Sequence, residues 1–317
     1  MGLEEDIIAA GRRLGFNAVG IAAAGPAQTI DRFRDWLAAG HAANMEYLKR
    51  AAVTRADPGR LLPNVRSIIV AAACYPANPD PGRGFSTYAR GRDYHLVVRA
   101  KLTRLLTFIN AGTGAAGKGP AANPGQARVC VDASPLLERE WALRAGIGWR
   151  GRQNQVVNPE FGCCFVLGEI LTDLDLSPST PMAGGCGDCR RCVEACPTGA
   201  LRPDGFLDAR RCLSYLTVEH KADIPAGIAG SMGETLFGCD FCTAVCPRNR
   251  PGDEHVMPEL RGRALPDART CLQMTEGEFK RQFKDTAVLR TGLPRLRRNA
   301  AVAAANARAG MRSSGKA

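Results

Sequence analysis

Short apolar runs alternate with amphipathic helical patterns along the first half of the chain. Apolar residues recur at helical spacing from Leu3 to Leu14 and from Asp31 to Ala39, which predicts two surface helices over a sheet. Three further apolar runs have the length of strands and are separated by helical patterns. These runs cover residues 67–73, 127–131 and 164–171. The alternation predicts an α/β (α+β) domain over residues 1–180.

The rest of the chain divides into two further segments. A helical pattern from Tyr94 to Asn110 is followed by residues 111–126, which are rich in Gly, Ala and Pro and predict a flexible connection. The cysteine-rich part further on is loop-like, with one helical pattern near 210–220. Helical patterns at 276–283 and 294–307 then predict a short C-terminal helical segment. The predicted units are residues 1–180, 181–252 and 253–317.

Eight of the thirteen cysteines form a run with the spacing of a ferredoxin. The first half reads C-x2-C-x2-C-x3-C-P, and the second reads C-x2-C-x3-C-P with one more cysteine between the halves. In this spacing three thiolates hold one cubane and the fourth reaches across to the other. The sequence therefore predicts a ferredoxin-like domain with two [4Fe-4S] clusters. The predicted ligands are Cys186, Cys189, Cys192 and Cys246 for the first cluster and Cys196, Cys212, Cys239 and Cys242 for the second.

Two other uses of these cysteines remain open: a pair of zinc sites or a frame of disulfides. Zinc sites seldom place a third cysteine at the next x2 step followed by x3-C-P. The acidic N-terminus, Met1 to Asp6, has neither the basic nor the apolar region of an export signal, so we expect a cytoplasmic protein. Five cysteines lie outside the run, and three of them are in apolar strand-like stretches typical of a core. The five are Cys74, Cys130, Cys163, Cys164 and Cys271.

The overall charge is basic. The chain has 42 Lys and Arg against 31 Asp and Glu, a net charge of +11, which suits a polyanionic partner such as nucleic acid. A generally basic proteome would give the same balance. Basic side chains gather near the C-terminus and form either a solvated face or a phosphate-contacting one. They are Lys280, Arg281, Lys284, Arg290, Arg295, Arg297 and Arg298. No segment approaches the roughly 18 apolar residues of a membrane span, so we expect no membrane contact.

Two clusters move electrons, and residues 1–180 are far more than a ferredoxin requires. We therefore expect that something bound in that domain is reduced. No G-x-G-x-x-G follows a strand and no P-loop occurs, so a tightly bound nucleotide is not indicated. Asp93-Tyr94-His95 matches part of the D-x-H-x-x-G cobalamin signature, but Val98 stands where glycine is needed.

Several stretches resemble the epoxyqueuosine reductases, and the resemblance runs through almost the whole chain. The most specific one outside the cysteines is Asp132 to Arg139, continued by residues 145–151. The other matching stretches are residues 14–21, 36–40, 45–48, 55–58, 61–63, 88–95, 290–292 and 298–303. The resemblance implies a cobalamin-dependent enzyme that removes the epoxide oxygen from epoxyqueuosine at the wobble position of tRNA. It also implies cobalamin binding without the histidine-ligating signature.

The resemblance further implies roles for single residues. Electrons would pass through the clusters to cobalt, while Asp132 matches the family's proton donor and needs a pKa raised by burial from about 3.9. A helix N-cap before Pro135 is the alternative for Asp132. Arg139, two turns along the same predicted helix face, matches a cation facing the lower side of the cobalt. His95 could instead be a capping or packing residue. The residues that match the cobalamin lining are Arg55, His95, Asp132, Arg139, Val156, Leu167 and Ser214.

The chain also departs from the family. Arg152-Gln153-Asn154 replaces the usual Lys-His pair after Gly151, and the helical repeats with which many members grip tRNA are reduced to one candidate helix. The expected partners are still tRNA with a queuosine-type anticodon and an external electron donor, with the protein as a monomer. Two alternatives are a reductive dehalogenase, usually exported with a twin-arginine leader that we do not find here, and a plain electron carrier, against which the large α/β half argues.

Overall fold

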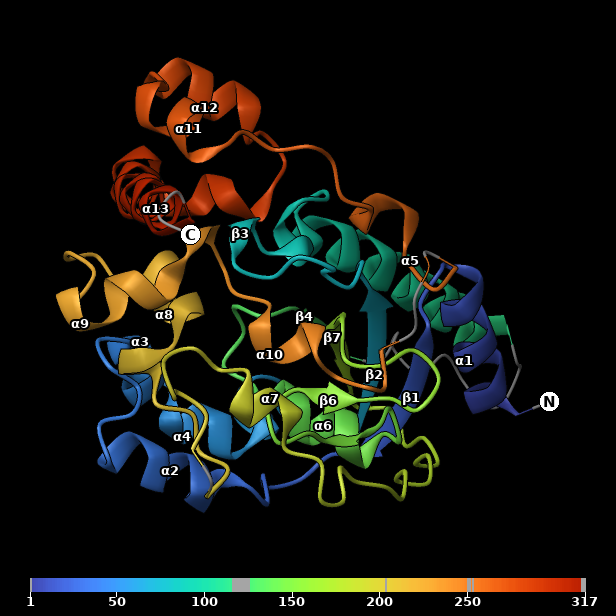
Figure 1. Cartoon of the computed structure of the whole chain (residues 1–317). Helices are drawn as coiled ribbons and strands as arrows, with labels where there is room; N and C mark the ends of the chain where they lie inside the picture. The colour runs from blue at the N-terminus through green and yellow to red at the C-terminus, as the bar shows by residue number, and fades with distance from the viewer. Residues whose placement is uncertain (1, 116–125, 203, 250–251, 253, 315–317) are drawn as a thin grey trace.

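The computed structural model describes residues 2–115, 126–202, 204–249, 252 and 254–314. Its centre is a four-stranded sheet in the order β1-β2-β7-β4, in which all neighbouring strands are antiparallel (Figure 1). The strands are β1 (Ala18–Ala23), β2 (Ser67–Cys74), β4 (Ala127–Cys130) and β7 (Phe165–Thr172). The three strands predicted from apolar runs are confirmed, and the antiparallel order gives the α+β form of the predicted fold.

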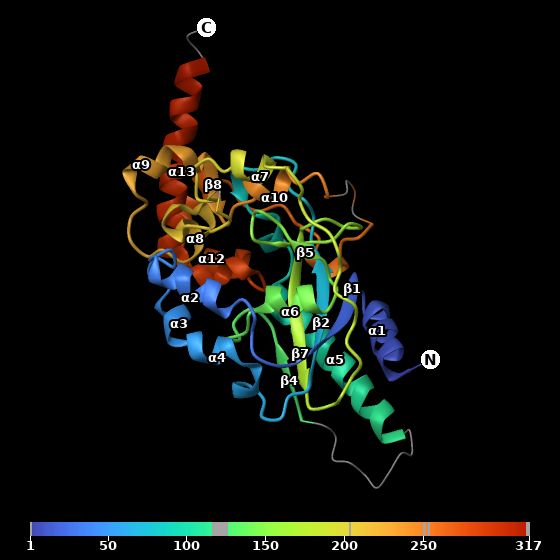
Figure 2. The ribbon, with the colours of Figure 1, turned by 90° about the horizontal axis from the view of Figure 1, so that it is seen from below.

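Helices cover both faces of this sheet, which explains why the apolar runs are unbroken. All eight residues of β2 are buried, and they point alternately to two separate apolar cores. α1 and α5 lie over one face and α6 lies over the other (Figure 2). A Cβ at Gly168 would lie 2.5 Å from Val98 of α5, and one at Gly20 would lie 1.9 Å from the carbonyl oxygen of Ala145. Glycine at these two positions therefore lets the layers approach closely. The helices are α1 (Leu3–Arg13), α5 (Tyr94–Ala115) and α6 (Glu138–Arg144).

Two helix predictions need correction. α2 (Ile30–Ala38) exists, but it has no buried residue and lies against α4 (Ala52–Ala56) instead of over the sheet. Its amphipathic pattern therefore marks a peripheral contact. α5 continues to Ala115, so the first five residues of the predicted flexible connection are helical. Residues 116–125 of that connection lie outside the described part of the chain.

The cysteine-rich segment and the C-terminus are tied to the rest of the molecule by a second, two-stranded sheet. β3 (Arg83–Phe85) pairs in parallel with β8 (Glu234–Phe237), and α13 packs on β8. Phe237, Phe283 and Leu296 are fully buried in the core between them. The remaining helices are α3 (Glu46–Arg50), α7 (Arg191–Glu194), α8 (Leu213–Val218), α9 (Ala226–Ala229), α10 (Phe241–Ala244), α11 (Ala268–Gln273), α12 (Glu276–Gln282) and α13 (Leu293–Ser314), and the hairpin strands are β5 (Trp149–Arg150) and β6 (Val156–Val157).

The helices predicted near 210–220, 276–283 and 294–307 correspond to α8, α12 and α13. The boundaries of the three units, 1–180, 181–252 and 253–317, stay predictions. Among the described residues, no helix combines the length and the apolar character that crossing a membrane would require.

Candidate functional site

Asp132, the predicted catalytic residue, lies in the loop that follows β4. Its backbone is in the left-handed region, with φ of 51°, which residues other than glycine rarely adopt. Its N–H donates to Oε1 of Glu138 at 2.6 Å. α6 begins only at Glu138, with Leu137 at the N-cap position. The N-cap alternative for Asp132 was therefore wrong, and so was the expectation that Asp132 and Arg139 share a helix face, because the chain between them turns instead of coiling.

A chain of hydrogen bonds leads from Asp132 into the interior. Nε2 of His95 lies 2.8 Å from Oδ2 of Asp132, and Nδ1 of the same ring lies 2.6 Å from Oδ1 of Asp93. Nη2 of Arg290 donates to Oδ2 of Asp93 at 2.9 Å. The ring of Tyr94 stacks on His95 with centroids 4.0 Å apart. The side chain of Asp132 is 55% exposed, against 12% for His95 and 7% for Asp93, so the chain opens to solvent at Asp132.

The charges in this chain favour a proton on the histidine. Burial alone would lower the pKa of His95, but its hydrogen bonds to Asp132 and Asp93 outweigh burial and raise the pKa to about 8. Burial alone would raise the pKa of Asp132, but the hydrogen bond and charge of His95 lower it. The protein's own groups therefore lower the pKa of Asp132, and the increase expected from burial beside the corrin stays a prediction. At neutral pH the proton is held on His95, directly behind an ionised Asp132.

Two carboxyl groups lie under the Asp132 loop. Burial raises the pKa of Glu138, and the negative charge of Asp132 adds to the increase. Glu169, in the middle of β7, is 0% exposed, and burial followed by the charge of Glu138 raises its pKa well above the ordinary range. Neither oxygen of Glu169 has a hydrogen-bond partner among the described residues. The positive charges of Arg139 and Arg55 oppose the increase in the pKa of Glu138. Asp132 is therefore surrounded by two cations, Arg55 and Arg139, and by two carboxyl groups that can hold a proton.

The residues expected to line cobalamin fall into three places. Arg55 joins the Asp132 group: its Nη1 donates to the carbonyl of Leu136 at 2.7 Å, and its Nε is buried with no partner in the described part of the chain. Val156 is buried in the apolar core beneath α6, and Leu167 packs against that core. Ser214 is half-buried on α8.

The helix that carries Ser214 reaches the same region as Asp132. Burial raises the pKa of Tyr47 to about 12, and the charges of Glu219, Asp132 and Tyr215 add to that increase. Tyr47 therefore lies near both the α8 segment and the Asp132 loop. Tyr47 lies on α3 and is 45% exposed, so this region is accessible to solvent at Tyr47.

The first predicted cysteine quartet surrounds one pocket. The pocket has a volume of about 310 Å³. It is lined by all four cysteines of the quartet together with Trp149, Gln153, Val157, Gly185, Arg191, Pro247 and Arg248.

The second predicted quartet is also assembled in space. Burial raises the pKa of Cys239 to about 12, and the charges of Cys212 and Cys196 add to it. Burial also raises the pKa of Cys242, and the charges of Cys239, Cys212 and Cys196 add to that increase. Thiols that raise one another's pKa in this way are suited to bind a cationic centre that draws them into the thiolate form.

A single zinc ion would need each thiolate sulfur to lie about 2.3 Å from the metal. In the described ranges no group of three or more His, Cys, Asp or Glu side chains is arranged closely enough to hold one metal ion.

The five cysteines outside the run are all buried, between 0% and 5% exposed, as expected for core residues.

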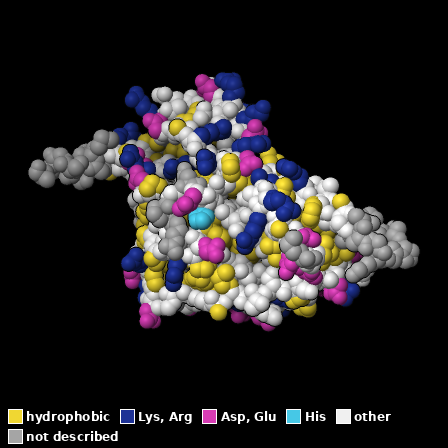
Figure 3. Space-filling model, turned by 90° about the vertical axis from the view of Figure 1, so that its right-hand side faces the viewer, with side chains coloured by type: hydrophobic (Ala, Val, Ile, Leu, Met, Phe, Trp, Pro, Cys, Tyr) yellow, Lys and Arg dark blue, Asp and Glu magenta, His cyan; other side chains and the backbone are white. Residues whose placement is uncertain are grey.

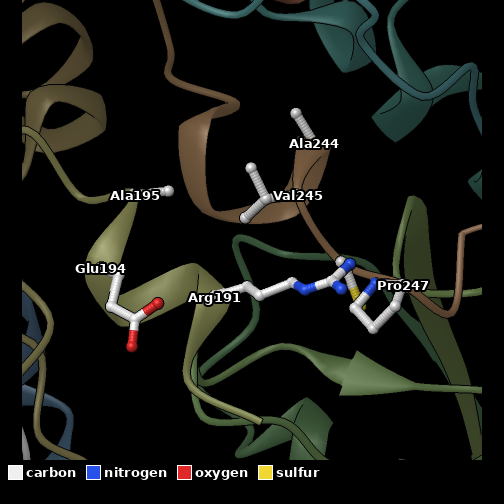
Figure 4. A pocket seen from close by; sticks show the side chains of 7 residues that line it. Arg191, Glu194, Ala195, Ala244, Val245 and Pro247 are labelled. Carbon is white, nitrogen blue, oxygen red and sulfur yellow. The ribbon is translucent and has the colours of Figure 1, made fainter.

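A more open pocket of about 570 Å³ adjoins the first quartet. Cys246 lines both pockets, and so does Arg191. In Figure 4 the side chain of Arg191 points from α7 toward Pro247, whereas Glu194 points away from it. The first quartet therefore lies close to the surface of the molecule.

The basic residues near the C-terminus divide into two groups. Arg290, Arg295, Arg297 and Arg298 bind groups of the protein itself: Asp93 for the first, and the backbone carbonyls of Val218, Met274 and Leu216 for the other three. Arg290 and Arg297 are nevertheless exposed, as a solvated or a phosphate-contacting face requires, whereas Arg295 and Arg298 are half-buried. Lys280, Arg281 and Lys284 are exposed. On the face in Figure 3, basic side chains are interspersed with acidic ones.

Sequence reasoning missed four residues of the Asp132 group: Asp93 as a partner of His95, and Glu138, Glu169 and Arg290. One of them had a signal, because Glu169 is an acidic residue inside an apolar strand run. The others are recognisable only once the fold brings them together.

Comparisons with known proteins agree with this site. The family model described as epoxyqueuosine reductase QueG, DUF1730 matches residues 55–133, and the one described as 4Fe-4S double cluster binding domain matches residues 185–249. The epoxyqueuosine reductase of Alicycliphilus denitrificans is 36% identical to this chain. The alignment covers 96% of this chain and 88% of the relative. That of Shewanella oneidensis is 37% identical, over 94% of this chain and 78% of its own.

Solved structures give the same result. An epoxyqueuosine reductase crystallised with an epoxyqueuosine-modified stem loop of tRNA-Tyr superposes with a TM-score of 0.85 at 30% identity, covering 96% of this chain and 81% of that one. The Bacillus subtilis enzyme, solved with its catalytic aspartate loop swung out of the active site, gives 0.82 at 30% identity and the same coverage. The double-cluster segment, the Asp132 loop and the similarity along nearly the whole chain agree: this chain belongs to the epoxyqueuosine reductase family.

Proposed function

We propose that this protein reductively removes the epoxide oxygen from epoxyqueuosine at the wobble position of tRNA and gives queuosine. The observation that carries the proposal is the exposed Asp132 carboxylate at the end of a buried chain that holds a proton. One relative was solved with an epoxyqueuosine-modified stem loop, which supports the substrate. Of the three classes considered, membership in the family favours this reductase over a dehalogenase or a plain electron carrier.

The reaction sets a demand for protons that the Asp132 group can meet. Removing the epoxide oxygen as water consumes two electrons and two protons, and opening the ring leaves an alkoxide that needs a proton in the transition state. His95 holds a proton at neutral pH and faces Oδ2 of Asp132 through Nε2. Asp93 fixes the other ring nitrogen, so Nε2 stays directed at Asp132. A proton can then pass from His95 to Asp132 and on to the leaving oxygen.

The cysteine quartets supply the route for electrons. We assign Cys186, Cys189, Cys192 and Cys246 to the first [4Fe-4S] cluster and Cys196, Cys212, Cys239 and Cys242 to the second. The first quartet adjoins the open pocket, so it suits electron entry from an external donor. Cys212 directly precedes α8, which reaches toward the Asp132 region, so the second quartet suits delivery to the catalytic side.

The Asp132 region also fits cobalamin. It combines an exposed carboxylate, a buried Arg55 Nε without a partner among the described residues, and the apolar core that holds Val156 and Leu167. An unpartnered buried donor suits the amide or phosphate oxygens of such a cofactor. When bound, cobalamin would supply the low-potential cobalt that delivers electrons to the epoxide. Arg139 would offer a cation to the lower side of the cobalt. The proposed contacts are Arg55, His95, Asp132, Arg139, Val156, Leu167 and Ser214.

Substrate tRNA would be held in part by its backbone. Lys280, Arg281 and Lys284 are exposed and suit phosphate contacts on or near α12. We propose that the protein acts in the cytoplasm, as a monomer, with an external electron donor.

The test is anaerobic reconstitution with iron, sulfide and cobalamin, followed by reduction with epoxyqueuosine-containing tRNA and mass spectrometry of the digested nucleosides. Conversion to queuosine that depends on cobalamin is the expected result. Bound clusters and cobalamin without conversion would assign the machinery to another substrate, and clusters without cobalamin binding would leave an electron carrier.

A further inference from the structure

The wall of the first cysteine pocket carries hydrogen-bond donors that lack acceptors. Trp149 and Gln153 line this pocket and are only 8% and 5% exposed. Nε1 of Trp149 and Nε2 of Gln153 are both buried; the first has no hydrogen-bond partner within the described residues, and the second has none there beyond the neighbouring Cys163 thiol. A buried N–H without an acceptor costs free energy, so an acceptor that occupies the pocket would stabilise both donors.

The local structure fixes both side chains. Gln153 lies in the turn between β5 and β6, where a Cβ at Gly151 would be 2.1 Å from its Oε1. The missing side chain at Gly151 therefore leaves room for the Gln153 amide to fold over the backbone. The ring of Trp149 is held between Gly184, whose Cβ would lie 2.6 Å from it, and the guanidinium of Arg248 at 5.6 Å. Both side chains are therefore closely packed against the backbone of neighbouring segments.

Both donors lie next to Cys246, one of the proposed ligands. Trp149 and Cys163 are buried in one small apolar cluster, and Cys246 packs against it. Cys246 and the Gln153 amide both lie within hydrogen-bond reach of the Cys163 thiol. The Gln153 amide, Cys163 and Cys246 are therefore in direct succession along the pocket wall.

Both quartets also have backbone donors. In the second, Cys196 accepts hydrogen bonds from the backbone N–H groups of Leu201, Thr198 and Ala200 and lies 3.7 Å from the Thr198 hydroxyl, and Cys212 accepts from the N–H groups of Tyr215 and Ser214. In the first, Cys192 accepts from the N–H of Val193, and Cys246 from those of Arg248 and Asn249. Backbone N–H donors are positioned by the turns of the segment and do not depend on which side chains the segment carries.

We propose that Trp149 and Gln153 donate N–H···S hydrogen bonds to the sulfur atoms of the first [4Fe-4S] cluster and thereby raise its reduction potential. This inference rests on the ligand assignment of the proposed function. Reduction adds negative charge to the cluster, and donors aimed at its sulfurs stabilise the more negative state. The cluster nearest the open pocket then accepts electrons more readily from an external donor.

The test uses the full chain, reconstituted anaerobically with iron and sulfide, and a redox titration followed by EPR. Trp149→Phe keeps an aromatic ring but removes the N–H, and Gln153→Met keeps the length of the side chain but removes the amide. Gln155→Met is the matched control, because it makes the same replacement two residues away, outside the pocket lining. Cys189→Ala identifies the signal of the first cluster by its loss. Gln153→His restores a ring N–H.

Each donor-free variant should lower the potential of the first cluster alone. At a fixed potential its ratio of reduced to oxidised form should fall about three- to tenfold, where tenfold corresponds to about 59 mV for one electron. Gln155→Met should match the wild type, and Gln153→His should recover part of the shift. Unchanged potentials in both donor-free variants, or an equal shift of both clusters, would overturn the inference.

Two other outcomes are also decisive. If both donor-free variants fail to hold the first cluster while Gln155→Met is fully loaded, the side chains serve assembly and the tuning role is overturned. If the wild type itself does not assemble two clusters, the ligand assignment fails first, and the inference falls with it. The two failures are distinguished by iron content before any potential is measured.

Discussion

The two halves of the candidate site are built in opposite ways. All eight proposed cysteine ligands come from one segment, residues 186–246, and seven of them stand in two runs of short spacing. The hydrogen-bonded chain behind Asp132 instead joins Asp93 and Arg290, which are 197 residues apart, through the first turn of α5 and the end of β4. The cysteine segment depends on its metal centres and local turns, whereas the Asp132 group depends on the packing of the whole molecule.

This difference determines how each half responds to change. Removing a ligand from the cysteine segment should empty one centre and leave the sheet intact. Altering the Asp132 group should change charges that are coupled to one another, because each member shifts the pKa of its neighbour. Effects there should therefore depend on pH, and effects in the cysteine segment should depend on iron.

The largest effect is expected from Cys239→Ala. This thiol belongs to the second proposed quartet, so its loss should remove that cluster, leave roughly half of the bound iron and abolish turnover, because electrons lose their route. Iron and sulfide content, EPR and nucleoside mass spectrometry measure the three results. Cys271→Ala is the control, since Cys271 is buried outside both quartets and should keep all the iron. Full iron retention in Cys239→Ala would contradict the assignment.

Asp132→Asn should lower turnover by about 10²- to 10⁴-fold, the usual contribution of general acid catalysis. Iron content and cobalamin binding should be unchanged, because the amide keeps the shape of the side chain. Asp31→Asn, at an 85% exposed carboxylate, is the control and should leave turnover at the wild-type rate. Normal turnover in Asp132→Asn would remove this residue from the mechanism.

The contrast also explains what could be predicted from sequence. The apolar runs that became β2, β4 and β7 are local patterns, so three of the four strands of the central sheet were predicted, whereas β1 was not. The spacing of the cysteines is also a local pattern, and it is what predicts the two quartets. The left-handed backbone of Asp132 and the contact of its carboxylate with His95, 37 residues away, are not local patterns. They depend on where the end of β4 meets the start of α5. For the same reason the sign of the pKa shift at Asp132 could not be predicted from burial alone.

His95→Gln should remove a dependence on pH. The pKa of His95 in the folded protein is about 8, above the value of about 6.5 for an unfolded chain. Its ion pairs therefore contribute stability that is fully present below about pH 6.5 and is lost as the pH rises through about 8. The difference of about 1.5 units corresponds to at most about 2 kcal/mol. Urea denaturation at pH 6 and pH 9 should show a gap between wild type and variant that closes at the higher pH.

The activity of the same variant gives an independent measurement. Wild-type kcat/KM should fall as the pH rises through about 8, because His95 loses the proton that it passes to Asp132. His95→Gln should be slower and should lack this fall. His255→Gln, at an exposed histidine, should keep the wild-type profile. An alkaline fall that persists unchanged in His95→Gln would separate His95 from the proton path.

The effect of Glu169→Gln on stability should have the opposite sign to that of His95→Gln. Burial raises the pKa of Glu169 well above its unfolded value, so the folded protein binds a proton that the unfolded chain releases. Wild-type stability should therefore fall as the pH rises above the unfolded pKa of about 4.3, by at most about 1.4 kcal/mol per pH unit. Glutamine has nearly the same shape and does not titrate, so the variant should equal the wild type near pH 4 and exceed it increasingly toward pH 7 in urea denaturation. Glu160→Gln, at an exposed carboxylate, should give a curve parallel to the wild type. If Glu169→Gln is parallel as well, the carboxyl under the Asp132 loop is ionised in the fold, and Glu138 must hold the only proton of that pair.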